Sequence, residues 1–266
     1  MNRIDKKFIE LKKRRKKALI IYMTAGDPSL QKNEALIYAF EKDGVDLIEL
    51  GVPFSDPLAD GPVIQEASQR ALKRKTNLIK ILKLVSRVRR RSQVPILLMS
   101  YLNPILSYGL MAFAKMAKRS GVDGVIIPDL PPDEGKEIAS AMCRYGIDLV
   151  YLAAPTSTKK RIRLIAGASR GFIYYVSITG ITGARRSLPL RIDQSLRAVK
   201  REAHLPVCVG FGVSTPRQAS KAVRSSDGVI IGSAVVKALA ARPAVNAAQF
   251  SKKFIRPFAR ALGKKG

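Results

Sequence analysis

The hexapeptide Gly44-Val-Asp-Leu-Ile-Glu49 returns, slightly varied, at three other places in the chain. The variants are Gly121-Val-Asp-Gly-Val-Ile126, Gly146-Ile-Asp-Leu-Val-Tyr151 and Ser226-Asp-Gly-Val-Ile230. Each combines the exit of a helical pattern, an aspartate and the start of a short apolar run. Recurrence of one strand–helix unit favours a barrel over a doubly wound sheet. No Gly-x-Gly-x-x-Gly follows the first apolar run, so a dinucleotide-binding fold has little support.

Eight short apolar runs, rich in Val, Ile, Leu or Tyr, lie at and between these units. Their apolar character is continuous rather than alternating, which is typical of parallel strands buried on both faces. The expected strands cover residues 18–24, 47–51, 95–100, 124–127, 148–152, 172–176, 206–210 and 228–231.

Amphipathic helical patterns fill the gaps between the expected strands. They cover residues 4–15, 30–43, 63–74, 78–91, 110–120, 132–145, 159–168, 194–202, 215–223, 233–241 and 245–264. No linker rich in Pro, Gly or Ser divides the chain. The sequence therefore predicts an α/β protein, a single (β/α)8 TIM-barrel domain over residues 1–266. An extra helix precedes the first strand, and extra helices follow strands 2 and 8.

The charge is strongly basic, with 48 Lys and Arg against 20 Asp and Glu and a net charge of +28. Such a balance suggests nucleic acid or another acidic partner. The basic residues are spread along the chain, however, mostly where helices turn outward. No RNA-binding or helix-turn-helix signature accompanies them. We interpret them as a solvated basic surface and do not expect nucleic acid to be the partner.

Two cysteines, Cys143 and Cys208, and one histidine, His204, are too few for a zinc site built from these residue types. We expect both thiols to be reduced core residues of a cytoplasmic protein. His204 precedes an apolar run and is expected at a loop or strand edge.

The basic run at 12–17 and the apolar residues after it imitate a secretory signal. The apolar part is short and runs straight into Gly26-Asp-Pro28, so a first buried strand is the better interpretation. No apolar run approaches the length of a membrane span.

Function in a barrel lies in the loops that follow the strands. Glu49 ends the second expected strand, and Asp60 lies in the Pro- and Gly-stiffened loop after it. Two carboxylates with different surroundings can take different acid/base roles. A strand-end charge and a turn residue are the alternative, and spacing alone leaves both open.

Three glycine-bearing loops indicate a phosphate site. Gly180-Ile-Thr-Gly183 follows strand 6, Gly210-Phe-Gly212 ends strand 7, and Gly232-Ser233 opens the helix after strand 8. Glycines let backbone N–H groups approach a phosphate, and a helix N-terminus adds favourable partial charge. Barrels often bind phosphate in this region. Ordinary tight turns are the alternative.

Motifs in chain order over nearly the whole sequence resemble those of the tryptophan synthase alpha subunit family. They are Thr24-Ala-Gly-Asp-Pro28, Glu49-Leu-Gly51, Pro53-Phe-Ser-Asp-Pro-Leu-Ala-Asp-Gly-Pro62, Thr179-Gly-Ile-Thr-Gly-Ala184, Gly210-Phe-Gly-Val-Ser214 and Gly232-Ser-Ala-Val-Val-Lys237. The stretch from Pro53 to Pro62 is nearly diagnostic by itself.

The resemblance implies a lyase of tryptophan biosynthesis that cleaves indole-3-glycerol phosphate to indole and glyceraldehyde 3-phosphate by a retro-aldol reaction. It implies Glu49 and Asp60 as the catalytic pair, with Tyr174 near the reacting centre. The other implied site residues are Tyr22, Tyr101, Ile126 and Leu152 around the indole, and Thr182, Gly183, Gly212, Gly232 and Ser233 toward the phosphate and the closed site.

No metal or organic cofactor is expected in this chain. The resemblance implies a pyridoxal-phosphate beta subunit as partner, in an alpha2beta2 heterotetramer. The segment 180–190 has no apolar periodicity and predicts a mobile lid. The neighbouring loop 54–62 is expected to expose Phe54, Pro57 and Leu58, a cluster suited to docking another subunit. We therefore expect faster turnover in the presence of the partner.

Two features depart from the family pattern: Tyr22 stands where Phe is common, and the overall charge is more basic than expected. Two other functions stay open at this point. Another phosphate-binding barrel of tryptophan or histidine biosynthesis fits the glycine loops but not the Pro53–Pro62 stretch. A basic nucleic-acid-binding protein built on a barrel fits the charge, but retention of Glu49, Asp60 and the phosphate loops opposes it.

Overall fold

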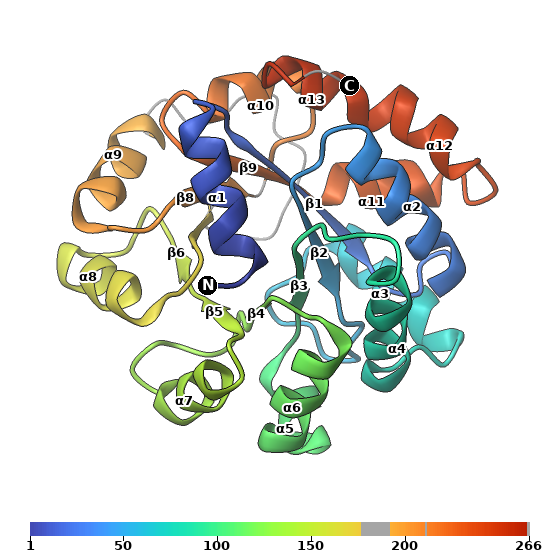
Figure 1. The fold of residues 1–266 in the computed structure, drawn as a ribbon, viewed down its shortest axis with the longest axis horizontal. Helices are drawn as coiled ribbons and strands as arrows, with labels where there is room; N and C mark the ends of the chain where they lie inside the picture. The colour runs from blue at the N-terminus through green and yellow to red at the C-terminus, as the bar shows by residue number, and fades with distance from the viewer. Residues whose placement is uncertain (177–191, 211, 265–266) are drawn as a thin grey trace.

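A computed structural model describes residues 1–176, 192–210 and 212–264. At its centre is a parallel sheet with the strand order β5-β4-β3-β2-β1-β9-β8-β7-β6 (Figure 1). The strands are β1 (Ala18–Thr24), β2 (Leu47–Gly51), β3 (Ile96–Met99), β4 (Gly124–Ile126), β5 (Asp148–Val150), β6 (Leu152–Ala153), β7 (Ile173–Val176), β8 (Val207–Gly210) and β9 (Gly228–Ile231).

The two ends of this sheet belong to one expected strand. β5 pairs with β4, β6 pairs with β7, and only Tyr151 separates β5 from β6. The Arg170 N–H donates to the Leu149 carbonyl at 3.0 Å, and the Tyr174 N–H donates to the Tyr151 carbonyl at 3.1 Å. These bonds join the two ends into a nearly closed parallel barrel, which confirms the predicted fold class.

Helices surround the barrel on its outer side, except that α1 lies across one end of it (Figure 1). They are α1 (Arg3–Lys13), α2 (Leu30–Lys42), α3 (Pro62–Lys73), α4 (Leu78–Val88), α5 (Leu102–Tyr108), α6 (Leu110–Ser120), α7 (Lys136–Arg144), α8 (Lys159–Ala168), α9 (Ile192–Glu202), α10 (Pro216–Ala222), α11 (Ser233–Ala240), α12 (Ala247–Phe250), η1 (Ser251–Ile255) and α13 (Arg256–Ala261). The extra helices before β1, after β2 and after the last strand are as predicted. Within the described residues, no helix is long and apolar enough to cross a membrane.

Three details differ from the sequence predictions. α5 was not expected, because it is only seven residues long and contains Pro104. The expected last helix is divided into α12, the π-helical turn η1 and α13. The division is explained by Pro257, which has no N–H for the i→i−4 bond. Cys143 is exposed on α7 rather than in the core, whereas Cys208 is buried as expected.

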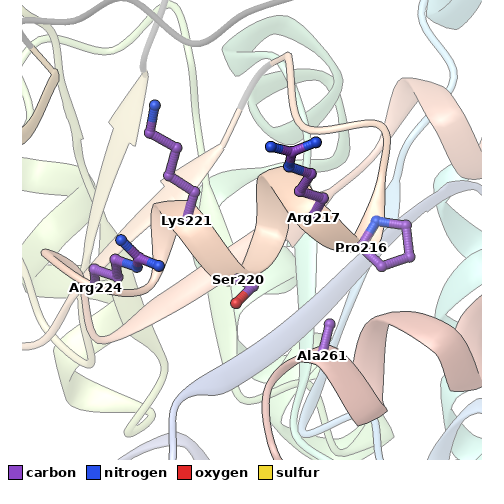
Figure 2. A pocket seen from close by; sticks show the side chains of 6 residues that line it. All are labelled: Pro216, Arg217, Ser220, Lys221, Arg224 and Ala261. Atoms are coloured by element: carbon purple, nitrogen blue, oxygen red, sulfur yellow. The ribbon is translucent and has the colours of Figure 1, made fainter.

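The helices α10 and α13 pack against each other on the outside of the barrel. A groove remains between them, lined mainly by residues of α10 (Figure 2).

Alternation along the strands divides the core into an interior cluster and an outer cluster. On β1, Ala18, Ile20 and Tyr22 belong to the interior cluster, while Leu19 and Ile21 pack into the layer between strands and helices. Successive side chains of a strand point to opposite faces, so this alternation places every second residue inside the barrel.

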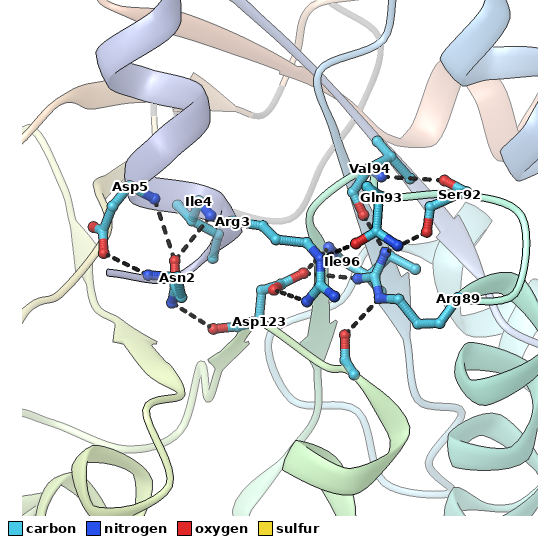
Figure 3. Close-up of polar contacts among 11 residues, drawn as sticks. Asn2, Arg3, Ile4, Asp5, Arg89, Ser92, Gln93, Val94, Ile96 and Asp123 are labelled. Carbon is cyan, nitrogen blue, oxygen red and sulfur yellow. Dashed lines mark hydrogen bonds and ion pairs between the residues drawn. The ribbon is translucent and has the colours of Figure 1, made fainter.

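The amino ends of the strands are covered by α1. Its residues Ile4, Phe8 and Leu11 are buried in the interior cluster, and the Phe8 ring lies 5.7 Å from the Phe172 ring. Asn2 caps the helix by accepting the N–H groups of Ile4 and Asp5. Its side-chain amide also donates to the Asp123 carbonyl at 3.0 Å (Figure 3). The N-terminal helix therefore closes the base of the barrel.

The aspartate of the recurring hexapeptide ties the base of each strand to its neighbour. Carboxylates of Asp46, Asp123 and Asp227 accept the N–H groups of Leu19 at 2.7 Å, Ile96 at 2.9 Å and Val207 at 3.0 Å, respectively. The sequence repeat thus has a structural cause.

The fourth copy differs. One oxygen of Asp148 has no hydrogen-bond partner, and its pKa is raised to about 6, mainly by burial.

Asp123 makes further polar contacts at the base of the barrel, beyond its bond to the Ile96 N–H. Its carboxylate also accepts hydrogen bonds from Arg89 at 2.7 Å and Arg3 at 3.0 Å (Figure 3), and its side chain is only 2 % exposed.

We expect Asp123→Ala to destabilise the protein by about 3–5 kcal/mol, because it leaves a buried guanidinium without its carboxylate. Chemical denaturation measures the loss. The matched control is Asp133→Ala, which removes an exposed partner of Arg161 and should move the unfolding midpoint little. Equal losses in the two variants would contradict this role for Asp123.

Candidate active site

Glu49 occupies an interior position of β2. Leu47 two residues earlier lies in the interior cluster, and Ile48 and Leu50 pack outward. The Glu49 side chain is 1 % exposed, and neither carboxylate oxygen has a hydrogen-bond partner in the described structure. A buried carboxyl without a donor is unfavourable, so it needs a reason other than stability.

The environment keeps Glu49 protonated at neutral pH. Burial is the main cause that raises its pKa to about 8, and the negative charge of Asp60 adds to the effect. A carboxylic acid poised near neutrality can both give and take a proton, which is the property of a general acid/base.

Asp60 lies in the loop between β2 and α3, one residue before the Gly61 cap of α3. Its carbonyl accepts the Gln65 side chain at 2.8 Å. Burial raises the pKa of Asp60 to about 6, and a hydrogen bond from Tyr101 opposes the rise. Asp60 therefore ionises at a lower pH than Glu49, and the two carboxyls have opposite protonation states between about pH 6 and 8.

Tyr101 anchors the loop that carries Asp60. Its hydroxyl accepts the Ala59 N–H at 2.9 Å, and its ring lies 5.3 Å from the Phe54 ring. Phe54 and Pro57 are half-buried, and only Leu58 of the expected docking cluster is fully exposed, at 91 %. This corrects the expectation that all three are exposed.

A second support for this loop was missed from sequence. Arg70 of α3 binds buried Asp27 with two hydrogen bonds of 2.8 and 3.0 Å. The Asn33 side chain accepts the Gly26 N–H at 2.7 Å and donates to the Asp27 carbonyl at 3.2 Å. The Thr24–Pro28 motif is therefore a brace between the loop after β1 and α3.

Two tyrosines form a wall of the site, and each depends on a glycine in another strand. A Cβ on Gly51 would lie 2.1 Å from the Tyr22 hydroxyl, and one on Gly210 would lie 2.4 Å from the Tyr174 hydroxyl. Only glycine leaves room for these rings. Burial raises the pKa of both tyrosines, and the next causes are Asp60 for Tyr22 and Glu49 for Tyr174.

The structure gathers most of the expected pocket residues. Tyr22, Ile126 and Tyr174 belong to the interior cluster, and Leu152 packs against it. Tyr22 is also the register neighbour of Glu49 across β1 and β2. Tyr22 and Tyr174 lie close enough to Glu49 for its negative charge to raise their pKa values.

The structure describes some, but not all, of the residues that are expected to bind the phosphate. Gly232 caps α11 beside Tyr22, since a Cβ there would lie 3.5 Å from the Tyr22 Cβ, and Ser233 begins the helix. Gly212 is exposed and has a φ of 81°, a conformation that favours glycine. Thr182, Gly183 and the expected lid at 180–190 lie outside the described residues.

His204 is an exposed bend residue before β8, as expected. Among the described residues, no group of His, Cys, Asp and Glu is arranged to hold a metal ion. The described site brings together two carboxyls with unequal pKa values beside an aromatic wall.

Comparisons with known proteins agree with the family resemblance of the sequence motifs. A family model described as "Tryptophan synthase alpha chain" matches residues 8–261. The tryptophan synthase alpha chain of Geobacter sulfurreducens is 52 % identical over 237 residues, covering 89 % of this chain and 90 % of that protein. The alpha chain of a Thermoanaerobacter species is 48 % identical over 240 residues, covering 90 % and 91 %.

Solved structures agree with the sequence relatives. The tryptophan synthase alpha chain from Legionella pneumophila has a TM-score of 0.90 at 36 % identity and covers 99 % of this chain and 98 % of that one. A chain from a Pyrococcus furiosus structure described as the tryptophan synthase α2β2 complex has a TM-score of 0.86 at 40 % identity, covering 92 % and 99 %.

The raised pKa of Glu49 predicts a pH-dependent effect on stability. Unfolded Glu49 loses its proton near pH 4.5 and folded Glu49 near 8. Its stabilising contribution is complete below pH 4.5 and is lost as pH rises to about 8. Glu49→Gln removes this dependence, so the unfolding free energy of the variant should improve relative to the parent protein between pH 5 and 9.

Denaturant titrations at several pH values measure the effect. Glu66→Gln, at an exposed position of α3, controls for the loss of one surface carboxyl. A constant offset between Glu49→Gln and the parent from pH 5 to 9 would disprove the raised pKa.

Proposed function

The chain belongs to the family of tryptophan synthase alpha chains, and on that premise we propose how its residues carry out the reaction. It is a lyase of tryptophan biosynthesis, built as one barrel domain. The substrate is indole-3-glycerol phosphate, and the products are indole and glyceraldehyde 3-phosphate. The observation that carries the proposal is the Glu49 carboxyl, buried without a partner and with a pKa of about 8.

Glu49 handles the proton traffic of the retro-aldol step. Protonated Glu49 gives its proton to indole C3. The glycerol carbon attached to C3 carries a hydroxyl, and the Glu49 carboxylate takes the proton from it. As the C–C bond breaks, its electron pair restores the aromatic ring and the hydroxyl oxygen becomes the aldehyde oxygen. Glu49 ends the cycle protonated, so the step consumes no external acid or base.

Asp60 stabilises the charge that appears on the ring. Its carboxylate accepts the indole N–H and faces the positive charge that develops when C3 is protonated. With a pKa of about 6, Asp60 is ionised under conditions in which Glu49 is still protonated. Tyr174 and Tyr22 hold the indole between them, together with Ile126, Leu152 and Tyr101.

The phosphate is held beyond the last strands. Backbone N–H groups at Gly232 and Ser233, at the start of α11, face the anion, and Gly183 and Gly212 complete the cradle. Gly232 lies beside Tyr22, which supports the proposal that the phosphate and indole subsites are neighbours. Thr182 is assigned to contact with Asp60 when substrate is bound.

The partner is a beta subunit, in an alpha2beta2 heterotetramer in the cytoplasm, and pyridoxal phosphate belongs to that subunit. Exposed Leu58 supports this proposal, because it lies in the same loop as Asp60. Contact with Leu58 moves or orders Asp60 directly, so docking is expected to raise turnover.

A kinetic pH profile tests the catalytic pair. We expect kcat/KM for indole release to be bell-shaped, with limbs near the Asp60 and Glu49 pKa values of about 6 and 8. The alkaline limb is the more diagnostic, since the substrate's own phosphate titrates near pH 6. Glu49→Gln should lower the rate by on the order of a hundredfold or more, and Asp60→Asn should also be severe.

Glu66→Gln is the matched control, and each protein is assayed with and without a beta subunit. Near-normal turnover in Glu49→Gln would rule out the mechanism. A beta subunit that binds tightly yet leaves turnover unchanged would rule out the coupling through the Asp60 loop.

The phosphate cradle is tested by Gly212→Val. A branched side chain at a positive φ is strained and crowds the loop, so we expect KM to rise by about tenfold or more with a smaller change in kcat. Gly167→Val, at a helix position with nothing near its Cβ, is the control. The defect should vanish with indole glycerol, which lacks the phosphate. An equal defect with both substrates, or a soaked glycerol phosphate bound elsewhere, would refute the cradle.

A further inference from the structure

The last quarter of the chain is strongly basic. Residues 203–266 contain eleven Lys and Arg but a single acid, Asp227, which gives a net charge of +10 (11 − 1). Asp227 is already engaged by Lys200 at 2.7 Å and Lys17 at 3.7 Å. The acid of this segment is therefore not free to neutralise other cations.

Three of these cations form a row along the groove between α10 and α13. Arg217, Lys221 and Arg224 are exposed (Figure 2). Arg217 and Lys221 are four residues apart and share one side of α10, and Arg224 lies in the turn that follows the helix. Pro216, Ser220 and Ala261 complete the lining of this basic groove, which has a volume of about 440 Å³. Within the described residues, none of the three cations has an ion-pair partner.

The basic groove continues toward a second basic segment. The Lys17 ammonium donates to the Ser226 carbonyl at 2.7 Å, and the Lys16 ammonium contacts the Gly263 carbonyl. Residues 12–17, all basic, therefore lie at the same end of the barrel as the end of α10 and the C-terminal segment (Figure 1).

We propose that the basic groove binds the phosphodiester backbone of nucleic acid, without regard to base sequence, as a second function of the enzyme. The spacing fits. From Arg217 to Lys221 the helix rises about 6 Å, and one strand of duplex DNA carries a phosphate about every 3.4 Å. Arg224 extends the row in the turn that follows the end of α10 at Ala222. Three cations thus meet about three consecutive phosphates, and the Ser220 hydroxyl adds a further donor to phosphate oxygen.

The residues that line the groove also argue against base recognition and against a lipid surface as the partner. The groove contains no aromatic side chain on which a base stacks and no Asn or Gln that reads a base edge. With its three cations assigned to phosphates, the binding is electrostatic and independent of sequence. An anionic membrane is disfavoured as the partner. In the described residues after Leu164, no large hydrophobic side chain is exposed to enter a lipid surface. A concave groove also suits a strand better than a flat bilayer.

A salt titration tests the proposal with the full chain. Fluorescence anisotropy measures binding of a mixed-sequence DNA duplex and a single-stranded RNA, each of about 20 nucleotides per strand, between about 50 and 200 mM salt. The test variant is Arg217→Gln/Lys221→Gln/Arg224→Gln. The control, Arg74→Gln/Lys83→Gln/Arg90→Gln, removes the same charges from exposed positions on and beside α3 and α4.

We expect the groove variant to lower the slope of log K against log salt by about 2.7 for the duplex, or about 0.9 for each cation lost. Its affinity should fall at least tenfold, while the control stays close to the parent protein. Circular dichroism and indole release confirm that both variants are folded.

Equal losses in the two variants would overturn the proposal, because the binding would then reflect net charge alone. So would the absence of binding by the parent protein at about 100 mM salt, or tighter binding to anionic lipid vesicles than to either nucleic acid. A preference between duplex and RNA would identify which source of phosphodiester the groove favours.

Discussion

The nearly closed barrel allows only interior side chains that fit its apolar space, and Glu49 is a carboxyl placed in that space without a hydrogen-bond donor. The alternation of side chains along β2 fixes this position, because Leu47 and Glu49 share one face and Ile48 and Leu50 share the other. The consequence is a carboxylic acid that keeps its proton at neutral pH. The proposed chemistry follows from this one burial.

The surrounding structure holds the other groups in register with Glu49. Tyr22 pairs with Glu49 across adjacent strands, and Gly51 gives its hydroxyl room. Asp60 lies in a loop that Tyr101 anchors through its hydrogen bond with the Ala59 N–H. The helix that follows this loop, α3, is braced by the Arg70–Asp27 pair. A less buried site for Asp60 gives a lower pKa, and this difference separates the roles of the two carboxyls.

Much of this arrangement was predictable from the sequence, and the rest depends on contacts between distant residues. Continuous apolar runs located the strands within a residue or two, and the recurring aspartate indicated a repeated unit. Its purpose, to accept a neighbouring strand's N–H, appeared only in the structure. The motif resemblance predicts Glu49 and Asp60 as the catalytic pair. The need for Gly51 and Gly210 was not predicted, because it arises from tyrosines on β1 and β7. α5 was not predicted, because seven residues that include a proline show too little helical periodicity. Cys143 is exposed, which shows that composition alone does not reveal whether a thiol is buried.

The most direct test of the account is the titration of Glu49 itself in the free protein. Carbon-13 NMR of labelled glutamate carboxyls, compared between the parent and Glu49→Gln, identifies the resonance that belongs to this residue. We expect a midpoint of about 8. A midpoint near the ordinary glutamate value of about 4.3 would mean that the Glu49 carboxyl is ionised at neutral pH, and the proposed proton donor to indole C3 would be absent.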